Sequence, residues 1–329
     1  MKLTRRDFLK ATSAVATALG IPASSLLGLR EALGTETSDL PPIVWLQAQS
    51  CTGCSVSLIN TIRDFSIDEL LLNVLDLDFH PTVMAGAGEI AVDAAEAAYN
   101  NGEGPYILVV EGAIPTGANG LYCHLWEIPG EPPIVETAID VVQRYAASAH
   151  LVIAVGTCAA YGGMVAGAPN PTGAMGVQDV VGEDVPVVNI PGCPAHPDWI
   201  VGAIAYVLAN KAVPPLDRDG RPKAFFGTKV HDQCPRRNTE KVHELGEYGC
   251  LNALGCNGPN TGSDCPTRMW NAPEPAPEPD EDGEAVVGVN WCVGAGAPCY
   301  GCTEPSFPDG MAPFYKPGQI KAKVKAGRR

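Results

Sequence analysis

The spacing of twelve cysteines constrains this chain of 329 residues more than any other feature. Cys51 and Cys54 have the spacing Cys-x2-Cys, as do Cys299 and Cys302, and His231 precedes a cysteine by the same interval. Such spacing is compatible with a disulfide scaffold, with zinc sites or with iron–sulfur clusters. The residues around each cysteine must therefore decide among these three.

Short apolar runs alternate with helix-length segments between residues 42 and 190. The candidate strands are residues 42–47, 70–79, 106–110, 151–155 and 185–190, and the candidate helices are residues 88–100 and 135–147. Uniformly apolar runs are typical of strands buried in a parallel sheet. The alternation predicts an α/β fold with a doubly wound parallel sheet.

A first cysteine set follows from that fold. Cys51 and Cys54 come after the first expected strand, Cys158 follows the fourth and Cys193 the fifth. Because loops at the carboxyl ends of parallel strands meet at one sheet edge, we expect these four thiols to converge. Four thiolates can bind zinc or an iron–sulfur cluster. Glu111 also follows a strand near these loops, and we expect it to face a partner or to brace the backbone, with a proton-carrying or hydrogen-bonding role near the thiols as the alternative.

The periodicity ends near residue 215, and the remainder is rich in Gly, Pro and Cys. Metal clusters could replace the missing apolar core there. One histidine with three cysteines is an admissible ligand set for zinc or for a cluster, as are four cysteines. The two candidate sets are His231, Cys234, Cys250 and Cys256, and Cys265, Cys292, Cys299 and Cys302. Only Cys123 is left over, and we expect it to be a buried, inert thiol.

The first 34 residues have the features of an export signal. Arg5 and Arg6 precede an uncharged stretch rich in Ala, Ser and Thr, in which Gly20 and Pro22 make a poor membrane-spanning helix. This pattern is typical of the twin-arginine route, which carries folded proteins that already hold their cofactors. We therefore expect residues 1–34 to be a signal peptide and the protein to lie in the periplasm or on the outer face of the cytoplasmic membrane. No other segment is apolar and long enough to be a transmembrane anchor.

The charge of the chain limits its partners. The formal net charge is −15, which argues against nucleic acid, because phosphate binding needs clustered Lys and Arg. An acidic body instead favours a basic partner. Export to an oxidising compartment keeps the disulfide alternative open, but disulfides would leave His231 without a role.

The residues around the cysteines resemble the small, electron-transferring subunit of exported nickel–iron uptake hydrogenases. The matching segments extend over nearly the whole chain beyond the expected signal. They are Thr4–Lys10, Cys51–Ser55, Glu111–Pro115, Val155–Gly163, Pro191–Cys193, His231–Cys234, Gly249–Cys256, Asp264–Pro266, Asn290–Val293 and Cys299–Cys302. The resemblance implies a flavodoxin-like domain at residues 35–215, followed by an irregular iron–sulfur domain at residues 216–329.

The resemblance also implies three clusters. A proximal 4Fe-4S cluster would be bound by Cys51, Cys54, Cys158 and Cys193, and a distal 4Fe-4S cluster by His231, Cys234, Cys250 and Cys256. In most of the family the medial cluster is 3Fe-4S, with proline where this chain has Cys292. A fourth thiolate, as in the nickel–iron–selenium branch, implies a medial 4Fe-4S cluster on Cys265, Cys292, Cys299 and Cys302. The cluster would be 3Fe-4S if Cys292 were not a ligand.

Oxygen-tolerant members of that family carry two extra cysteines around the proximal cluster. The corresponding positions in this chain are Gly53 and Gly163. The resemblance therefore implies a standard proximal cluster and no oxygen tolerance by that mechanism.

The implied reaction is the reversible conversion of H2 into two protons and two electrons. The nickel site would lie on a separate large subunit, which could contain selenium, so no catalytic residue is expected in this chain. Electrons would pass through the three clusters to a c-type cytochrome or a membrane cytochrome. One alternative is a free-standing, ferredoxin-like electron carrier. Another is a quinone-oxidoreductase subunit of the respiratory-complex type, which shares the resemblance of the proximal domain.

Overall fold

The computed structural model describes residues 41–61, 67, 70–71, 75–100, 106–128, 131–270 and 291–311. The expected signal peptide lies outside these residues. Among the residues described, no helix has the length and apolar character needed to cross a membrane.

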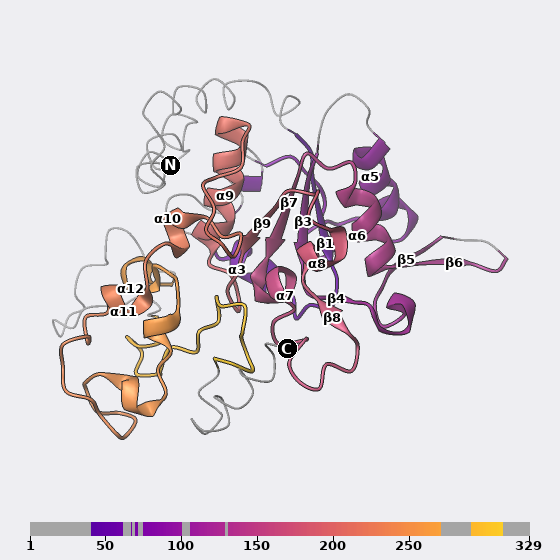
Figure 1. Cartoon of the computed structure of the whole chain (residues 1–329). Helices are drawn as coiled ribbons and strands as arrows, with labels where there is room; N and C mark the ends of the chain where they lie inside the picture. The colour runs from indigo at the N-terminus through magenta and orange to yellow at the C-terminus, as the bar shows by residue number, and fades with distance from the viewer. Residues whose placement is uncertain are drawn as a thin grey trace.

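A five-stranded parallel sheet forms the centre of the amino-terminal part (Figure 1). Its strands are β1 (Ile43–Gln47), β2 (Leu77–Phe79), β3 (Ile107–Glu111), β7 (Leu151–Val155) and β9 (Val187–Ile190). They lie in the order β2-β1-β3-β7-β9, and every neighbouring pair is parallel. This is the strand order of flavodoxin-like folds. The prediction of a doubly wound α/β fold is confirmed.

Helices on both faces of the sheet enclose two apolar cores. Alternate residues of β1 point to opposite faces, so that Trp45 belongs to one core and Val44 to the other. The first core is completed by α9 (Pro197–Asn210), which contacts α3 (Gly53–Ile59). The second is completed by α5 (Glu89–Asn100) and α6 (Ala138–Ala146).

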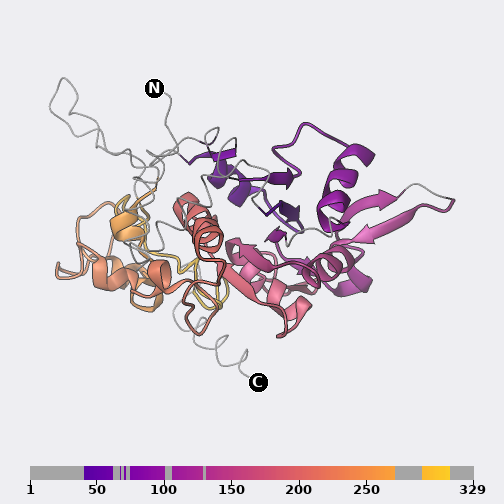
Figure 2. The ribbon, with the colours of Figure 1, turned by 90° about the horizontal axis from the view of Figure 1, so that it is seen from above.

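The remaining elements of this part are short. They are β4 (Ile114–Pro115), η2 (Gly117–Gly120), β5 (His124–Ile128), β6 (Ile134–Thr137), α7 (Gly156–Tyr161), β8 (Ala174–Met175) and α8 (Val177–Val181). β4 pairs with β8, and β5 pairs with β6 in a hairpin that projects from the body (Figure 2).

Two expected elements were wrong in their extent. Residues 70–79 were expected to form one strand, but Leu70 and Leu71 are helical and β2 contains only the last three residues. The helix expected at 135–147 begins at Ala138, because the preceding residues form β6. The Thr137 side chain accepts a hydrogen bond from the Asp140 amide and so caps this helix. The cap, rather than the apolar pattern, sets the start of α6.

The carboxyl-terminal part has few regular elements. These are α10 (Lys223–Phe226), α11 (Val230–Gln233), η3 (Leu251–Leu254), η4 (Gly258–Asn260) and α12 (Cys265–Arg268). Its apolar core is small and is built on Val230, Leu251, Trp291 and Val293, with Cys299 among them. In Figures 1 and 2 this part, coloured orange and yellow, packs beside the end of the sheet that carries α7 and α9. So small a core leaves the loops dependent on polar contacts or on bound groups.

Candidate metal centres

The first cysteine set lies where loops leave the carboxyl ends of the strands. Cys54 is in α3, just after β1, Cys158 is in α7, directly after β7, and Cys193 follows β9. Burial raises the pKa of the Cys54 thiol, and Glu111, Cys158 and Cys193 raise it further by repulsion. Burial likewise raises the pKa of Cys193 to about 11, with added repulsion from Cys158 and from Cys51. The structure thus brings all four thiols of this set within electrostatic reach of one another.

Glycine residues, which have no side chain, lie next to these thiols. Gly156 has a φ of +85°, and a Cβ atom there would lie 2.5 Å from the Cys54 Sγ. A Cβ on Gly53 would lie 3.1 Å from the Cys51 Sγ, and one on Gly163 would lie 2.8 Å from the Cys158 nitrogen. Backbone that approaches sulfur this closely without side chains is suited to the wrapping of a cluster. The surroundings of this set therefore fit an iron–sulfur group.

Glu111 braces the loop that carries Cys54. Its side chain is 1% exposed, and its carboxylate accepts hydrogen bonds from the Cys54 amide (3.1 Å), the Ser50 hydroxyl (2.9 Å) and the Trp45 indole N–H (3.2 Å). Of the roles expected for Glu111, the backbone brace and the hydrogen-bonding group fit this geometry, whereas a residue so buried does not face a partner.

His80 completes this network and was missed in the sequence analysis. Burial lowers the pKa of His80 from 6.5 to about 4, against an opposing attraction to Glu111. The His80 Nδ1 accepts a hydrogen bond from the Thr82 amide (3.1 Å), so the Nε2–H of the neutral ring can donate to the Ser55 hydroxyl (3.2 Å). Because a lone histidine carries no spacing signal, nothing in the sequence indicated this role.

The four residues of the histidine-containing set line a single pocket. These residues are His231 in α11, Cys234 at its end, and Cys250 and Cys256 on either side of η3. Arg236 also lines the pocket, and its Nη1 is buried without a hydrogen-bond partner. Thiols and an imidazole can bind iron, and the unpaired N–H of the Arg236 guanidinium can donate to a negatively charged group. The pocket therefore fits an iron–sulfur cluster.

In the third set Cys299 is buried, Cys265 and Cys302 are partly buried, and Cys292 is exposed. Burial raises the pKa of Cys265 and of Cys299 to about 12, and it raises that of Cys302 well above the usual range. The Cys292 thiol adds repulsion to all three. The Cys292 thiol thus lies within electrostatic reach of the other three and also of Cys256 in the histidine-containing set.

The three sets adjoin in one row. A backbone hydrogen bond from Cys193, in the first set, lowers the pKa of Cys302 in the third. The Cys299 amide donates to the Cys256 Sγ in the histidine-containing set (3.3 Å). The all-cysteine set of the carboxyl-terminal part therefore lies between the other two, in contact with both. Cys123 belongs to none of the sets, and burial raises its pKa.

Among the residues that the structure describes, no group of three or more His, Cys, Asp or Glu side chains is placed so as to hold a single metal ion.

Two family models together match most of the described chain. Residues 51–207 match the family of the 20 Kd subunit of NADH ubiquinone oxidoreductase, and residues 226–315 match the carboxyl-terminal domain of NiFe/NiFeSe hydrogenase small subunits. The second match separates this chain from a respiratory-complex subunit, which was the alternative that shares the proximal domain.

Comparison with individual proteins gives the same result over almost the full length. The chain is 41% identical to the periplasmic [NiFeSe] hydrogenase small subunit of Desulfomicrobium baculatum, over 96% of this chain and 99% of the other. It is 40% identical to the periplasmic [NiFe] hydrogenase small subunit of Solidesulfovibrio fructosivorans, over 96% and 94%.

Solved structures agree with the sequence relatives. The reduced, active Ni-Fe-Se hydrogenase of Desulfomicrobium baculatum aligns with a TM-score of 0.75 and 40% identity, over 84% of this chain and 98% of that chain. The actinobacterial-type NiFe-hydrogenase of Ralstonia eutropha H16 aligns with a TM-score of 0.73 and 30% identity, over 88% and 89%. With a flavodoxin-like sheet, three adjoining ligand sets and relatives of this kind, the chain belongs to the family of small subunits of periplasmic nickel–iron and nickel–iron–selenium hydrogenases.

Proposed function

We propose that the chain binds three 4Fe-4S clusters and conducts electrons between the nickel site of a large subunit and an external acceptor. The proximal ligands are Cys51, Cys54, Cys158 and Cys193, the medial ligands Cys265, Cys292, Cys299 and Cys302, and the distal ligands His231, Cys234, Cys250 and Cys256. The observation that carries the proposal is that these sets form one row in which each set contacts the next.

Individual residues of the chain have distinct roles in the proposed electron transfer. When bound, iron–sulfur clusters supply one-electron carriers. The backbone of Cys193 and that of Cys299 donate hydrogen bonds to thiols of the neighbouring sets, which stabilises thiolate charge and joins the sets. His231 supplies a neutral ligand in place of a fourth thiolate, which lowers the negative charge at the distal end.

The exposure of the proximal loops supports this end as the face for the large subunit. Cys51 and Cys193 are exposed, and Val56 and Ile59 on α3 are exposed apolar side chains beside them. Exposed apolar side chains that gather at a functional site are typical of protein–protein interfaces. We therefore place the large subunit over the proximal set, whether or not its active site contains selenium.

We propose a c-type or membrane cytochrome as acceptor at the distal end. The net charge of −15 favours a basic partner through long-range attraction. Attraction of this kind is screened by salt, so the rate of cytochrome reduction by the hydrogen-charged complex should fall strongly between low and physiological ionic strength. A rate that is indifferent to salt would reject the charge-steered acceptor.

We further propose that residues 1–34 direct export by the twin-arginine route and that the mature protein divides near residue 215 into its two domains. Replacing both Arg5 and Arg6 with lysine should leave the folded protein in the cytoplasm. Periplasmic accumulation of this double variant would contradict the assignment.

The test of the function is hydrogen-driven reduction of the isolated complex. A tagged chain, purified without oxygen, should bring down a nickel-containing large subunit, and H2 should bleach the visible absorption of its clusters. Recovery of the chain alone, loaded with clusters and insensitive to H2, would favour the free-standing electron carrier instead.

A further inference from the structure

Arg221 is a buried cation at the junction of the two parts of the chain. It closes a turn that begins at Asp217, just after α9, and only 6% of it is exposed. The Phe226 ring lies 5.7 Å from its guanidinium carbon. A charge so deeply buried requires partners on every side.

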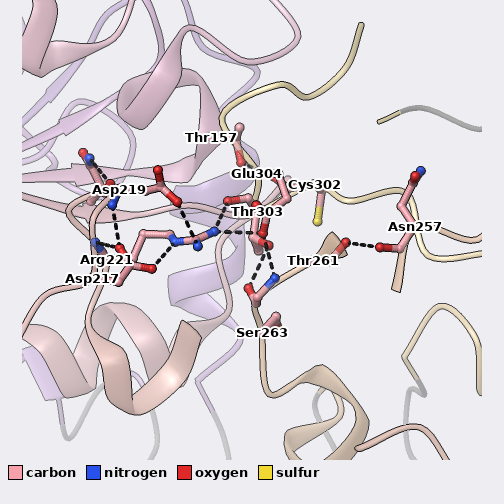
Figure 3. Close-up of polar contacts among 12 residues, drawn as sticks. Thr157, Asp217, Asp219, Arg221, Asn257, Thr261, Ser263, Cys302, Thr303 and Glu304 are labelled. Carbon is pink, nitrogen blue, oxygen red and sulfur yellow. Dashed lines mark hydrogen bonds and ion pairs between the residues drawn. The ribbon is translucent and has the colours of Figure 1, made fainter. Parts of the chain in front are cut away.

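Two of those partners hold Arg221 to its own turn. The Arg221 Nε donates to the Asp217 carboxylate (2.8 Å), and the Nη2 donates to that of Asp219 (3.2 Å). The Asp217 side chain also accepts a hydrogen bond from the Arg221 amide (3.0 Å). These bonds fix the direction of the guanidinium group (Figure 3).

The remaining donor reaches the loop that carries Cys302. The Arg221 Nη1 donates to the Thr303 carbonyl (3.0 Å) and to the Glu304 Oε1 (2.9 Å). Both acceptors directly follow the medial ligand Cys302. On its other side the same loop is tied to the proximal part, because the Thr157 hydroxyl donates to the Cys302 carbonyl.

Glu304 links Arg221 to the segment that precedes Cys265. The Oε1 that accepts from Arg221 also accepts from the Gly262 amide (2.7 Å). The Thr303 hydroxyl donates to the Gly262 carbonyl (3.0 Å), so the two loops are joined by two hydrogen bonds at Gly262. The next residue, Ser263, contacts the Cys265 sulfur at 2.9 Å.

We propose that Arg221, acting through Glu304, is the positioning residue of the medial centre, and that it holds the Cys302 loop against the Cys265 segment so that all four cysteines can bind a 4Fe-4S cluster. The inference rests on the proposed function, because it assumes that this set binds a cluster. It adds a residue that is not a ligand.

The geometry requires an arginine at this position. A planar guanidinium presents donors in several fixed directions, whereas a lysine ammonium is a point charge and cannot face three carboxylates in the same way. Without the cation, Asp219 and Glu304 would be partly buried carboxylates, and only Asp219 would keep a second cation, the exposed Arg218, nearby. Their repulsion would push the Cys302 loop away from the body of the protein.

The test compares variants of the intact, anaerobically purified complex. Arg221→Met removes the cation. Arg221→Lys keeps the positive charge but not the planar guanidinium group, and Glu304→Gln removes the negative charge of the carboxylate that accepts from Arg221. The matched control is Arg144→Met, because Arg144 is also paired with two carboxylates, Glu96 and Glu136, but lies in α6 on the far face of the sheet. The readouts are electron paramagnetic resonance spectra of the three clusters and the rate at which a chelator removes iron.

We expect Arg221→Met to lose medial iron about 10–100-fold faster than the native complex, which is the usual effect of removing a residue that supports metal ligands. Its oxidised form should show a 3Fe-4S signal, while the proximal and distal spectra stay unchanged. Arg221→Lys and Glu304→Gln should show the same loss to a smaller extent, and Arg144→Met should match the native complex.

The proposal is overturned if Arg221→Met and Glu304→Gln keep the native medial spectrum and iron, or if Arg144→Met loses medial iron equally. If Arg221→Met does not fold, Glu304→Gln decides between the same two results. The native complex separates this inference from the function: a native complex without a medial cluster defeats the proposed function, whereas normal native spectra with unaffected variants defeat only the role of Arg221.

Discussion

At the scale of single residues, spacing in the sequence was sufficient to propose every ligand, but not the residues that support the ligands. Cys292 is an example of the first kind, since its place in a motif predicts a fourth medial thiol; its role as a ligand stays a prediction, and its thiol lies within electrostatic reach of the other three. His80 and Arg221 are examples of the second kind. His80 contacts Ser55 and Arg221 contacts Glu304, which lie 25 and 83 positions away along the chain, so only the folded structure brings these pairs together.

The Cys292→Pro substitution tests the fourth medial thiol directly. Because the other three cysteines remain, we expect the oxidised complex to show a 3Fe-4S signal that the native complex lacks, at a higher medial reduction potential. The measurement is electron paramagnetic resonance with redox titration. An identical medial spectrum in native and variant complexes would mean that Cys292 is not a ligand.

Gly156 offers a test of the packing around the proximal set. An alanine there must adopt a φ of +85° and place its Cβ 2.5 Å from the Cys54 Sγ. Gly182→Ala is the matched control, because Gly182 has the same φ and nothing lies within 4 Å of its added Cβ. The control should cost about 1–3 kcal/mol of stability from the backbone alone, because Gly182 has a φ of 85° and a ψ of 170°, whereas Gly156→Ala should in addition lose proximal iron. Equal iron content in the two variants would show that the approach to Cys54 is unimportant.

At the scale of elements, the periodicity of apolar residues predicted the sheet, and it was least successful at the boundaries of the elements. The pattern over 134–146 is apolar enough for a strand or a helix throughout, and the chain changes from β6 to α6 at Thr137. The irregular carboxyl-terminal part could be predicted only as loops, because its contacts depend on individual side chains such as Glu304 rather than on a repeating pattern.

The cap of α6 can be tested by Thr137→Ala. The substitution removes the oxygen that accepts from the Asp140 amide, and it should lower the free energy of unfolding by about 1 kcal/mol. Denaturant unfolding of the chain measures this difference, and Thr137→Ser should recover most of it. A change below the error of the measurement would remove the cap as the cause of the boundary.

The hydrogen bond between His80, which directly follows β2, and Ser55 in α3 predicts that the stability of the fold depends on pH. The pKa of His80 is about 4 in the folded chain, below the unfolded value of 6.5, so the folded state favours the neutral ring. The contribution is fully present above pH 6.5 and is lost progressively as the pH falls toward 4, by at most about 3 kcal/mol. Unfolding measured between pH 7 and pH 4 should therefore be less steeply pH-dependent in His80→Gln than in the native chain. Equal slopes would contradict a neutral, buried His80.

At the scale of the whole molecule, one flavodoxin-like body and one loop-built part share a single row of ligand sets. Twelve ligand candidates, eleven thiols and one imidazole, are divided among three sets. The body supplies the first set from the loops after its strands, and polar contacts such as those of Arg221 and Thr157 attach the medial loops to that body. Three glycines, Gly53, Gly156 and Gly258, lie where an added Cβ would approach a cysteine sulfur.

The most direct test of this account is the iron content and resonance spectrum of the anaerobically purified, native complex. Three 4Fe-4S clusters predict about twelve iron atoms in this chain, beyond any in the large subunit, and no 3Fe-4S signal on mild oxidation. About eleven iron atoms with a strong 3Fe-4S signal would contradict the medial assignment, and stoichiometric zinc or a disulfide-linked, iron-free chain would contradict the account as a whole.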